Sequence, residues 1–96
     1  MPPIVSNADS RSGRRQVAVL FPAYNERDNL LELVPETLAV LEGAGYDHEI
    51  VVVDDGSSDG SRTALRPLIS DRVRYLRLRR NSGKSEALRV GLENID

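Results

Sequence analysis

Two adjacent carboxylates, Asp54 and Asp55, directly follow an apolar, β-branched run at residues 50–53. Such a run is typical of a strand that is buried on both faces of a parallel sheet. Because burying two carboxylates inside the sheet would be costly, we expect them at the carboxyl end of that strand. In open α/β sheets ligands bind at this end, so the segment predicts both an architecture and a site.

Four further side chains near predicted strand ends could complement these carboxylates. Tyr24 offers a flat face on which a base can stack, and Glu26 is another hydrogen-bond acceptor. Arg80 and Lys84 are cations that can meet a diphosphate or the polar rim of a base. Acceptors for a base or ribose, together with donors for phosphates, suit a nucleotide.

Taken singly, these residues also have structural explanations. Asp54 and Asp55 could simply end a strand and form a turn, and Tyr24 could pack in the core. Asn25 and Asp59 are expected to cap helices rather than to bind a ligand. The ligand interpretation depends on whether the three polar segments that follow the predicted strands, at 22–26, 54–57 and 79–84, converge in space.

Apolar runs and helical periods alternate along the chain and predict the order β-α-β-α-β-α. Strands are expected at 17–21, 49–53 and 73–78, and helices at 25–43, from a cap at 57–59 through 69, and at 85–93. Pro22 should end the first strand, Pro35 should kink or restart the first helix, and Pro67 should kink or stop the second. The third helix should present Leu88, Leu92 and Ile95 on one face.

Short connections in this order predict an α/β fold with a parallel sheet and right-handed crossovers. The three polar segments would then lie at one edge of the sheet, because the carboxyl ends of parallel strands coincide. Three such segments at one edge indicate a ligand site more specifically than any one of them does.

Composition excludes several classes of protein. The chain has 96 residues, which suffice for one small domain, and it has no cysteine for a disulfide or a thiolate metal site. Residues 1–16 are polar and lack an apolar period, so we expect a disordered tail before a domain at 17–96. The tail lacks the apolar core of a secretory signal, no segment approaches a membrane span, and a cytoplasmic location is expected.

The net charge is −2, but its distribution is uneven. Ten acidic residues and one basic residue lie between Glu26 and Asp59, whereas nine basic and three acidic residues lie between Gly60 and Ile95. The basic half could face phosphates, nucleic acid or an anionic membrane, or it could be a solvated face that complements the acidic half. For most arginines both explanations stay open.

Common phosphate-binding and hydrolytic signatures are absent. A P-loop ending at Gly83 and Lys84 would require glycine where Leu78 stands, and no dinucleotide fingerprint occurs. The only histidine, His48, precedes the second predicted strand, so neither a Ser-His-Asp triad nor a histidine metal site is expected.

The segments at 17–26, 49–60 and 80–92 resemble the opening of a family 2 glycosyltransferase. They are most similar to the polyprenyl-phosphate type, such as dolichyl-phosphate mannose synthases and bactoprenol glucosyltransferases. The resemblance covers the chain from Val17 onward. It implies the Rossmann-like GT-A fold, a UDP- or GDP-sugar as donor and a polyprenyl phosphate as acceptor, with no nucleic-acid partner. The residues that it assigns to the nucleotide-sugar are Pro22, Tyr24, Glu26, Val53, Asp55 and Lys84, with Arg80 as a secondary candidate and Asp54 as a support of the turn.

The family pattern continues beyond residue 96 into an Asp-x-Asp motif that binds a divalent cation, Mg²⁺ or Mn²⁺, and into a later catalytic carboxylate. The resemblance therefore implies that residues 17–96 form a partial domain whose metal ligands and catalytic residues lie outside this chain. We expect the 96-residue chain alone to transfer no sugar. We also expect its third-helix side and an outer strand to be uncovered, which favours self-association or low stability. The complete enzyme would lie peripherally at the cytoplasmic face of a membrane.

Two other classes compete with the transferase interpretation. One is a binding protein that keeps the nucleotide pocket without catalysis. The other is a signalling domain of the receiver type, which also carries paired aspartates after a strand. In receivers that pair normally ends the first strand, whereas Asp54 and Asp55 follow the second predicted strand, which argues against this class.

Overall fold

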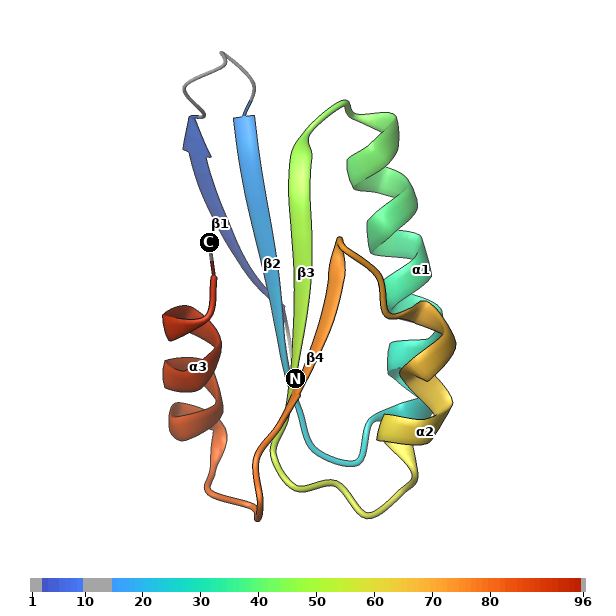
Figure 1. Ribbon diagram of the computed structural model, residues 1–96, viewed down its shortest axis with the longest axis vertical. Helices are drawn as coiled ribbons and strands as arrows, with labels where there is room; N and C mark the ends of the chain where they lie inside the picture. Colours follow the sequence, from blue (N-terminus) through green and yellow to red (C-terminus); the bar gives the residue numbers. More distant parts are fainter. Residues whose placement is uncertain (1–2, 10–14, 96) are drawn as a thin grey trace.

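The computed structural model describes residues 3–9 and 15–95, with the backbone alone described at 4–9 and 15. In this part of the chain one sheet has the strand order β1-β2-β3-β4 (Figure 1). The strands are β1 (Ile4–Asp9), β2 (Arg15–Ala23), β3 (Asp47–Asp54) and β4 (Val73–Arg77). The helices are α1 (Arg27–Gly43), α2 (Ser61–Leu65) and α3 (Lys84–Glu93), and the short 3-10 helix η1 (Arg66–Leu68) follows α2.

The parallel part of the sheet confirms the predicted fold class and element order. Strands β2, β3 and β4 pair in parallel and alternate with α1, α2 and α3 along the chain. The register places Ala23 opposite Asp54, and Asp54 opposite Arg77. The three strands therefore end at one level, and the loops that follow them begin side by side.

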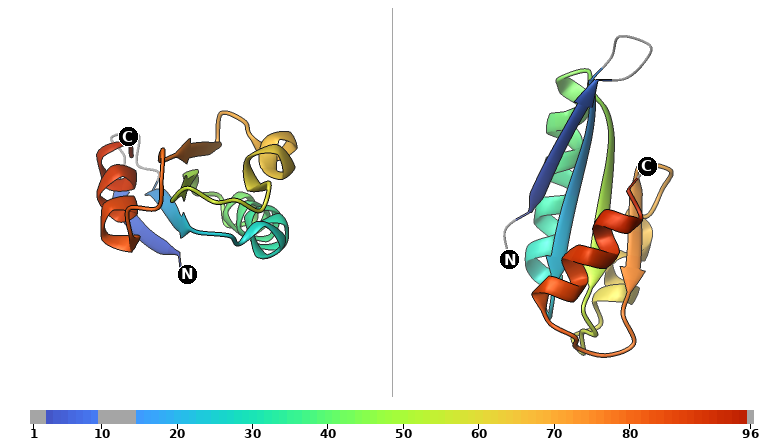
Figure 2. Two further views of the ribbon diagram at one scale, coloured as in Figure 1. Left: turned by 90° about the horizontal axis from the view of Figure 1, so that it is seen from below. Right: turned by 90° about the vertical axis from the view of Figure 1, so that its left-hand side faces the viewer.

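Helices cover both faces of this sheet, with α1 and α2 on one face and α3 on the other (Figures 1 and 2). Alternate residues of each strand point to opposite faces, which divides the core into two clusters. Phe21, Ile50 and Val52 belong to the cluster beneath α1 and α2. Leu20 and Val53 belong to the cluster beneath α3.

The apolar face of α3 differs from the predicted one. Leu88 and Ile95 pack against the core as predicted, but Leu92 is 56% exposed, so its assignment to this face is wrong. The residues buried under the helix are Ala87 and Gly91. Small residues bring the helix axis close to the strands, and this proximity excludes larger side chains at both positions.

Residues 4–9 correct the prediction of a disordered tail at 1–16. They form β1, which pairs antiparallel with β2 from Ile4 opposite Leu20 to Asp9 opposite Arg15. Without β1, the N–H and C=O groups along that side of β2 would form an open sheet edge. The rest of the expected tail that lies at 1–2 and 10–14 is outside the described residues.

β1 also changes the expectation of an uncovered sheet. It covers one edge of the parallel strands, whereas within the described residues β4 pairs with β3 alone, so the outer edge of β4 is open. Self-association through this edge stays a prediction.

The prolines act differently from one another. Pro22 does not end β2, because the strand continues through it to Ala23. The pairing with β1 stops at Leu20, so Pro22 has a strand on one side only, and its missing N–H can face the unpaired side. Pro35 lies inside the continuous helix α1, whereas Pro67 lies in η1, where α2 has stopped as predicted.

Replacing Gly91 with alanine should destabilise the fold. A Cβ there would lie 2.4 Å from Cδ1 of Leu20, a side chain that is 0% exposed, and 3.0 Å from Cγ2 of Val53. Overpacking of this kind costs about 1–3 kcal/mol, more than the gain in helix propensity of at most about 1 kcal/mol. Urea unfolding followed by circular dichroism measures the difference.

Gly43→Ala is the matched control, because a Cβ at Gly43 meets nothing within 4 Å. The urea midpoint of this variant should be unchanged or slightly raised relative to wild type. Equal urea midpoints for Gly91→Ala and Gly43→Ala would contradict the close packing of α3 against the sheet.

Candidate functional site

Three loops meet at the carboxyl edge of the parallel strands, at the bottom of Figure 1. The first loop (24–26) joins β2 to α1, the second loop (55–60) joins β3 to α2, and the third loop (78–83) joins β4 to α3. These loops contain the polar segments that the sequence predicts to converge. Hydrogen bonds between them confirm that they do.

The first and second loops are tied by reciprocal hydrogen bonds. The N–H of Asn25 donates to Oγ of Ser57 over 2.8 Å, and the N–H of Ser58 donates to Oδ1 of Asn25 over 2.8 Å. Asn25 has a positive φ of 53°, a conformation that asparagine adopts more readily than most residues. Its backbone and side chain therefore both face the second loop.

The hydrogen bonds of these loops correct the predicted helix cap at Asn25, whereas Asp59 accepts backbone donors at a helix start as predicted. Asn25 does not cap α1, because its side chain is bonded to Ser58. Instead, Oδ2 of Asp59 accepts the N–H of Arg27, the first residue of α1, over 3.0 Å. Oδ1 of Asp59 accepts the N–H of Ser61, the first residue of α2, over 3.1 Å. Asp59 thus serves two helix starts, as an acceptor at positions where backbone donors would otherwise be unpaired.

Hydrogen bonding dominates the ionisation of Asp59. Burial raises its pKa, but the hydrogen bonds from the Ser61 side chain and from the backbone of Arg27 and Ser61 outweigh burial, so the pKa is lowered overall. The carboxylate form is the one that accepts these donors.

Asp55 ties the second loop to the third. Its Oδ1 accepts the N–H of Ser82 over 2.7 Å, and its Oδ2 accepts the N–H of Gly83 over 2.8 Å. The side chain is 1% exposed, so these two donors compensate for its burial. Asp55 therefore fixes the loop that leads into α3.

Asp54 is equally buried but has different partners. Its Oδ1 accepts the N–H of Ser57 over 2.8 Å, which confirms the prediction that Asp54 supports the turn. Its Oδ2 accepts the hydroxyl of Tyr75, and Nη1 of Arg77 lies 3.5 Å from it. Burial and then the hydrogen bond to Asp54 raise the pKa of Tyr75, so the phenol remains the donor.

The predicted ligand residues divide into open and enclosed groups. Tyr24 is 38% exposed, Arg80 and Lys84 are exposed, and Glu26 is half-buried just before α1. These side chains stand at one edge of the sheet, as predicted.

Pro22 and Val53 are enclosed instead. The two residues pair across β2 and β3, and both are fully buried. Val53 packs in the cluster beneath α3. A ligand could reach these side chains only after α3 or the loops moved, so their assigned roles stay predictions.

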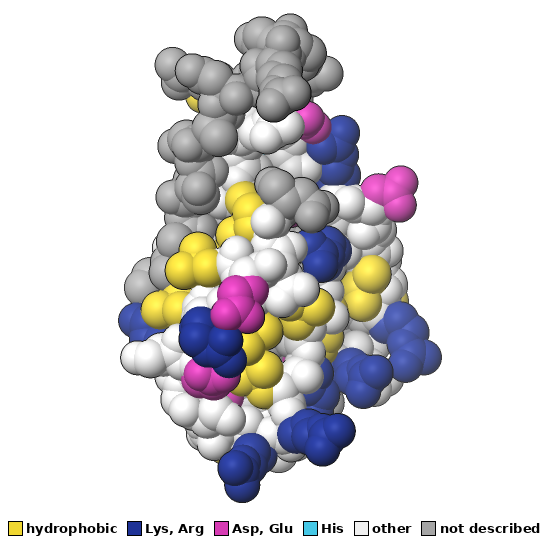
Figure 3. Space-filling view, turned by 60° about the vertical axis from the view of Figure 1, so that its left-hand side comes forward, with side chains coloured by type: hydrophobic (Ala, Val, Ile, Leu, Met, Phe, Trp, Pro, Cys, Tyr) yellow, Lys and Arg dark blue, Asp and Glu magenta, His cyan; other side chains and the backbone are white. Residues whose placement is uncertain are grey.

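Three arginines of the basic half pair with the acidic half. Arg72 contacts Asp47, Arg74 lies 4.0 Å from Glu49, and Arg77 lies 3.5 Å from Asp54. For these three, the interpretation as a complement to the acidic half is confirmed. In the face shown in Figure 3, Lys and Arg side chains gather along the lower rim.

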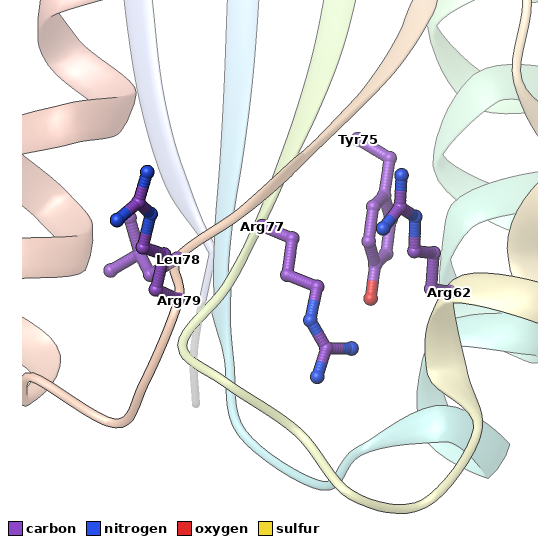
Figure 4. Close-up of a pocket in the computed structure, with 5 residues that line it drawn as sticks. All are labelled: Arg62, Tyr75, Arg77, Leu78 and Arg79. Atoms are coloured by element: carbon purple, nitrogen blue, oxygen red, sulfur yellow. The ribbon is translucent and has the colours of Figure 1, made fainter.

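A pocket of about 330 Å³ lies beside the end of β4, lined by Arg62, Tyr75, Arg77, Leu78 and Arg79. Its cations do not form a clamp for one anion. Figure 4 shows that Arg79 points to the opposite side of the β4 end from Arg77 and Arg62. Arg77 is also engaged, because its Nη2 donates to the carbonyl oxygen of Ser57 over 3.0 Å.

The described residues offer no group of three or more histidine and carboxylate side chains that could hold a metal ion. Asp54 and Asp55 do not fit such a site, because each is 1% exposed and its oxygens already accept protein donors. Nor does any helix of the described part have the length and apolar character needed to cross a bilayer.

Ser57, Tyr75 and Arg77 belong to the site but were not predicted to take part in it. The alternation of side chains along β4 gives a weak sequence signal for Tyr75 and Arg77, because these two residues must lie on the same face of the sheet. The register places Asp54 on that face too. No sequence pattern predicts the hydrogen bond between Ser57 and Asn25, because it depends on how two loops meet in space.

In open parallel α/β sheets ligands bind at the carboxyl edge, which is where the three polar loops of this chain meet. Comparison of the sequence with known families narrows the class of protein. Residues 18–96 match the model of glycosyl transferase family 2, and the chain belongs to this family. The transferase interpretation is therefore confirmed over the receiver class.

Two relatives are similar over most of this chain. The undecaprenyl-phosphate 4-deoxy-4-formamido-L-arabinose transferase of Edwardsiella ictaluri (strain 93-146) is 43% identical over 82 residues, 82% of this chain and 25% of its own length. The protein of the same name from Enterobacter sp. (strain 638) is 37% identical over 83 residues, 83% of this chain and 25% of its own length. The chain thus spans about a quarter of these relatives.

Replacing Gly56 with alanine should separate the second and third loops. Gly56 has a φ of +78°, and a Cβ there would lie 2.7 Å from the backbone carbon of Arg80 and from the nitrogen of Asn81. Backbone atoms cannot rotate away as a side chain can, so the contacts of Asp55 with the third loop should weaken. We expect a loss of about 1–3 kcal/mol from the clash, in addition to about 1–2 kcal/mol for the left-handed conformation.

Gly45→Ala isolates the second of these costs, because Gly45 has a φ of +75° but a Cβ there meets nothing within 4 Å. Chemical unfolding of both variants gives the free energy of unfolding that each one loses, and the difference between the two losses is the cost of the clash. Equal losses would show that the second and third loops tolerate separation.

Proposed function

We propose that this chain is the donor-binding region of a glycosyltransferase that moves a sugar from a nucleotide diphospho-sugar to a polyprenyl phosphate. The observation that carries the proposal is the set of three loops, joined by hydrogen bonds, at the carboxyl edge of a parallel sheet. Membership of glycosyl transferase family 2 and the names of the relatives support it.

In this proposal the open side chains hold the nucleotide. Tyr24 supplies a face on which the base stacks, and Glu26 an acceptor for the base or ribose. Asp55 has both oxygens bonded to backbone donors, but each carboxylate oxygen has a further lone-pair position. A base N–H could therefore reach Asp55 if the second and third loops moved slightly apart.

The diphosphate would lie toward the start of α3. Lys84 is the first residue of this helix, and Arg80 precedes it in the third loop. Both are exposed, and neither has an ion pair with a described residue. The free backbone N–H groups in the first turn of α3 add to the attraction for phosphate oxygens.

The proposal includes a divalent cation, Mg²⁺ or Mn²⁺, whose ligands come from residues outside this chain. When bound, such a cation neutralises negative charge on the diphosphate leaving group. Lys84 and Arg80 would share this task from the protein side, by holding the outer phosphate oxygens.

A polyprenyl-phosphate acceptor lies in a membrane, so the complete protein would work at a membrane surface. The relatives are named for transfer involving undecaprenyl phosphate.

Lys84→Gln should weaken nucleotide binding. Titration of the chain with UDP, GDP, UDP-glucose and GDP-mannose in a calorimeter identifies the base. Loss of a charge-assisted hydrogen bond of about 1.5–3 kcal/mol predicts a roughly 10- to 100-fold weaker affinity.

Arg89→Gln is the matched control. It removes the same charge from the same helix, but Arg89 is paired with Glu86 and Glu93 on the outer surface. Its affinity should stay within about twofold of wild type. Failure of the folded wild-type chain to bind any of the four ligands would overturn the proposed function.

A further inference from the structure

We propose that Tyr75 is a positioning residue for the donor site, which sets the place of the first loop by holding Asp54 and, through it, Ser57 and Asn25. For its ligand-binding consequence, this inference rests on the proposed function. Tyr75 itself lies on β4, on the face of the sheet that carries α1 and α2, and packs against the core there.

The first link joins the outermost parallel strand to the end of β3. The hydroxyl of Tyr75 donates to Oδ2 of Asp54, which is 1% exposed. A buried carboxylate oxygen needs a donor, and the nearest alternative, Nη1 of Arg77, stands 3.5 Å away. The phenol therefore determines where this carboxylate rests.

The second link runs from Asp54 through the second loop to the first. Oδ1 of Asp54 accepts the N–H of Ser57, and Oγ of Ser57 accepts the N–H of Asn25, each over 2.8 Å. Asn25 stands between Tyr24 and Glu26, two residues that the proposed function assigns to the nucleotide. A shift of the Asp54 carboxylate is thereby passed to the residues on both sides of Asn25.

Arg77 reinforces the same arrangement. Its Nη2 donates to the carbonyl oxygen of Ser57 over 3.0 Å, while its Nη1 faces Asp54. If the phenolic hydroxyl were removed, the guanidinium would be drawn toward the unpaired Oδ2 and away from Ser57. The hydrogen bond that Ser57 accepts from Arg77 and the one that it donates to Asp54 would then change together.

The test compares Tyr75→Phe with Tyr46→Phe. Both tyrosines are half-buried and pack against the same core cluster, but the Tyr46 hydroxyl has no hydrogen bond with a described residue. Each substitution removes one oxygen and keeps the ring, so the two should cost similar packing. Only Tyr75→Phe should affect the chain of hydrogen bonds.

The first measurement needs no ligand. In ¹H–¹⁵N spectra of the isotope-labelled chain, Tyr75→Phe should shift the amide signals of Ser57, Asn25 and Ser58, whereas Tyr46→Phe should leave all three in place. Shifts confined to β4 and Asp54 would overturn the inference.

The second measurement uses the nucleotide that the wild-type chain binds best. Loss of one net hydrogen bond predicts an affinity weaker by about 3- to 10-fold for Tyr75→Phe and unchanged for Tyr46→Phe. Ser57→Ala should weaken binding similarly, and the double variant should be no weaker than the worse single one, because both act on the same chain of contacts. Additive losses, or wild-type affinity in Tyr75→Phe, would contradict the inference.

The two measurements separate the two proposals. If the wild-type chain bound no nucleotide, the proposed function would fail, while the amide shifts would still decide whether Tyr75 sets the first loop. If the wild type bound but Tyr75→Phe bound equally well, only the inference on Tyr75 would fail.

Discussion

The carboxyl edge of the sheet is organised by the burial of two neighbouring carboxylates. Asp54 and Asp55 are each 1% exposed, and a buried carboxylate without donors would cost several kcal/mol. Since consecutive residues at a strand end point to opposite faces, the two cannot share donors. Asp54 takes donors from its own loop and from β4, and Asp55 takes them from the loop that leads into α3. This pair of residues thus connects β3, β4 and the second and third loops, and Ser57 extends the network to Asn25 in the first loop.

This arrangement gives the edge its chemistry. The loops bind one another through buried groups, which leaves Tyr24, Arg80 and Lys84 exposed around a framework of hydrogen bonds between the loops. Asp59 adds to the framework by accepting the first backbone donors of both α1 and α2. Preorganisation of this kind lowers the entropy that a ligand must lose on binding.

Local patterns predict most of the parallel fold, because apolar period and turn residues act over a few positions. The strands ending near Asp54 and Arg77, and the convergence of three loops, follow from such patterns. The strand β1 was not predicted, because it is stabilised by an edge of β2 rather than by its own composition. The role of Asn25 was also missed, because a left-handed backbone turns its side chain toward a loop 33 residues away.

The span of these contacts along the chain has a consequence for the order of assembly. The strands β2, β3 and β4 are neighbours in space in the order of their synthesis, so each new parallel strand can pair with the one before it. The donors to Asp55 lie 27 and 28 residues further on. Until they are synthesised, Asp55, which directly follows β3, lacks these two partners. The sheet can therefore form progressively as the polypeptide emerges, whereas the contacts of its carboxyl edge are completed only once the third loop is present.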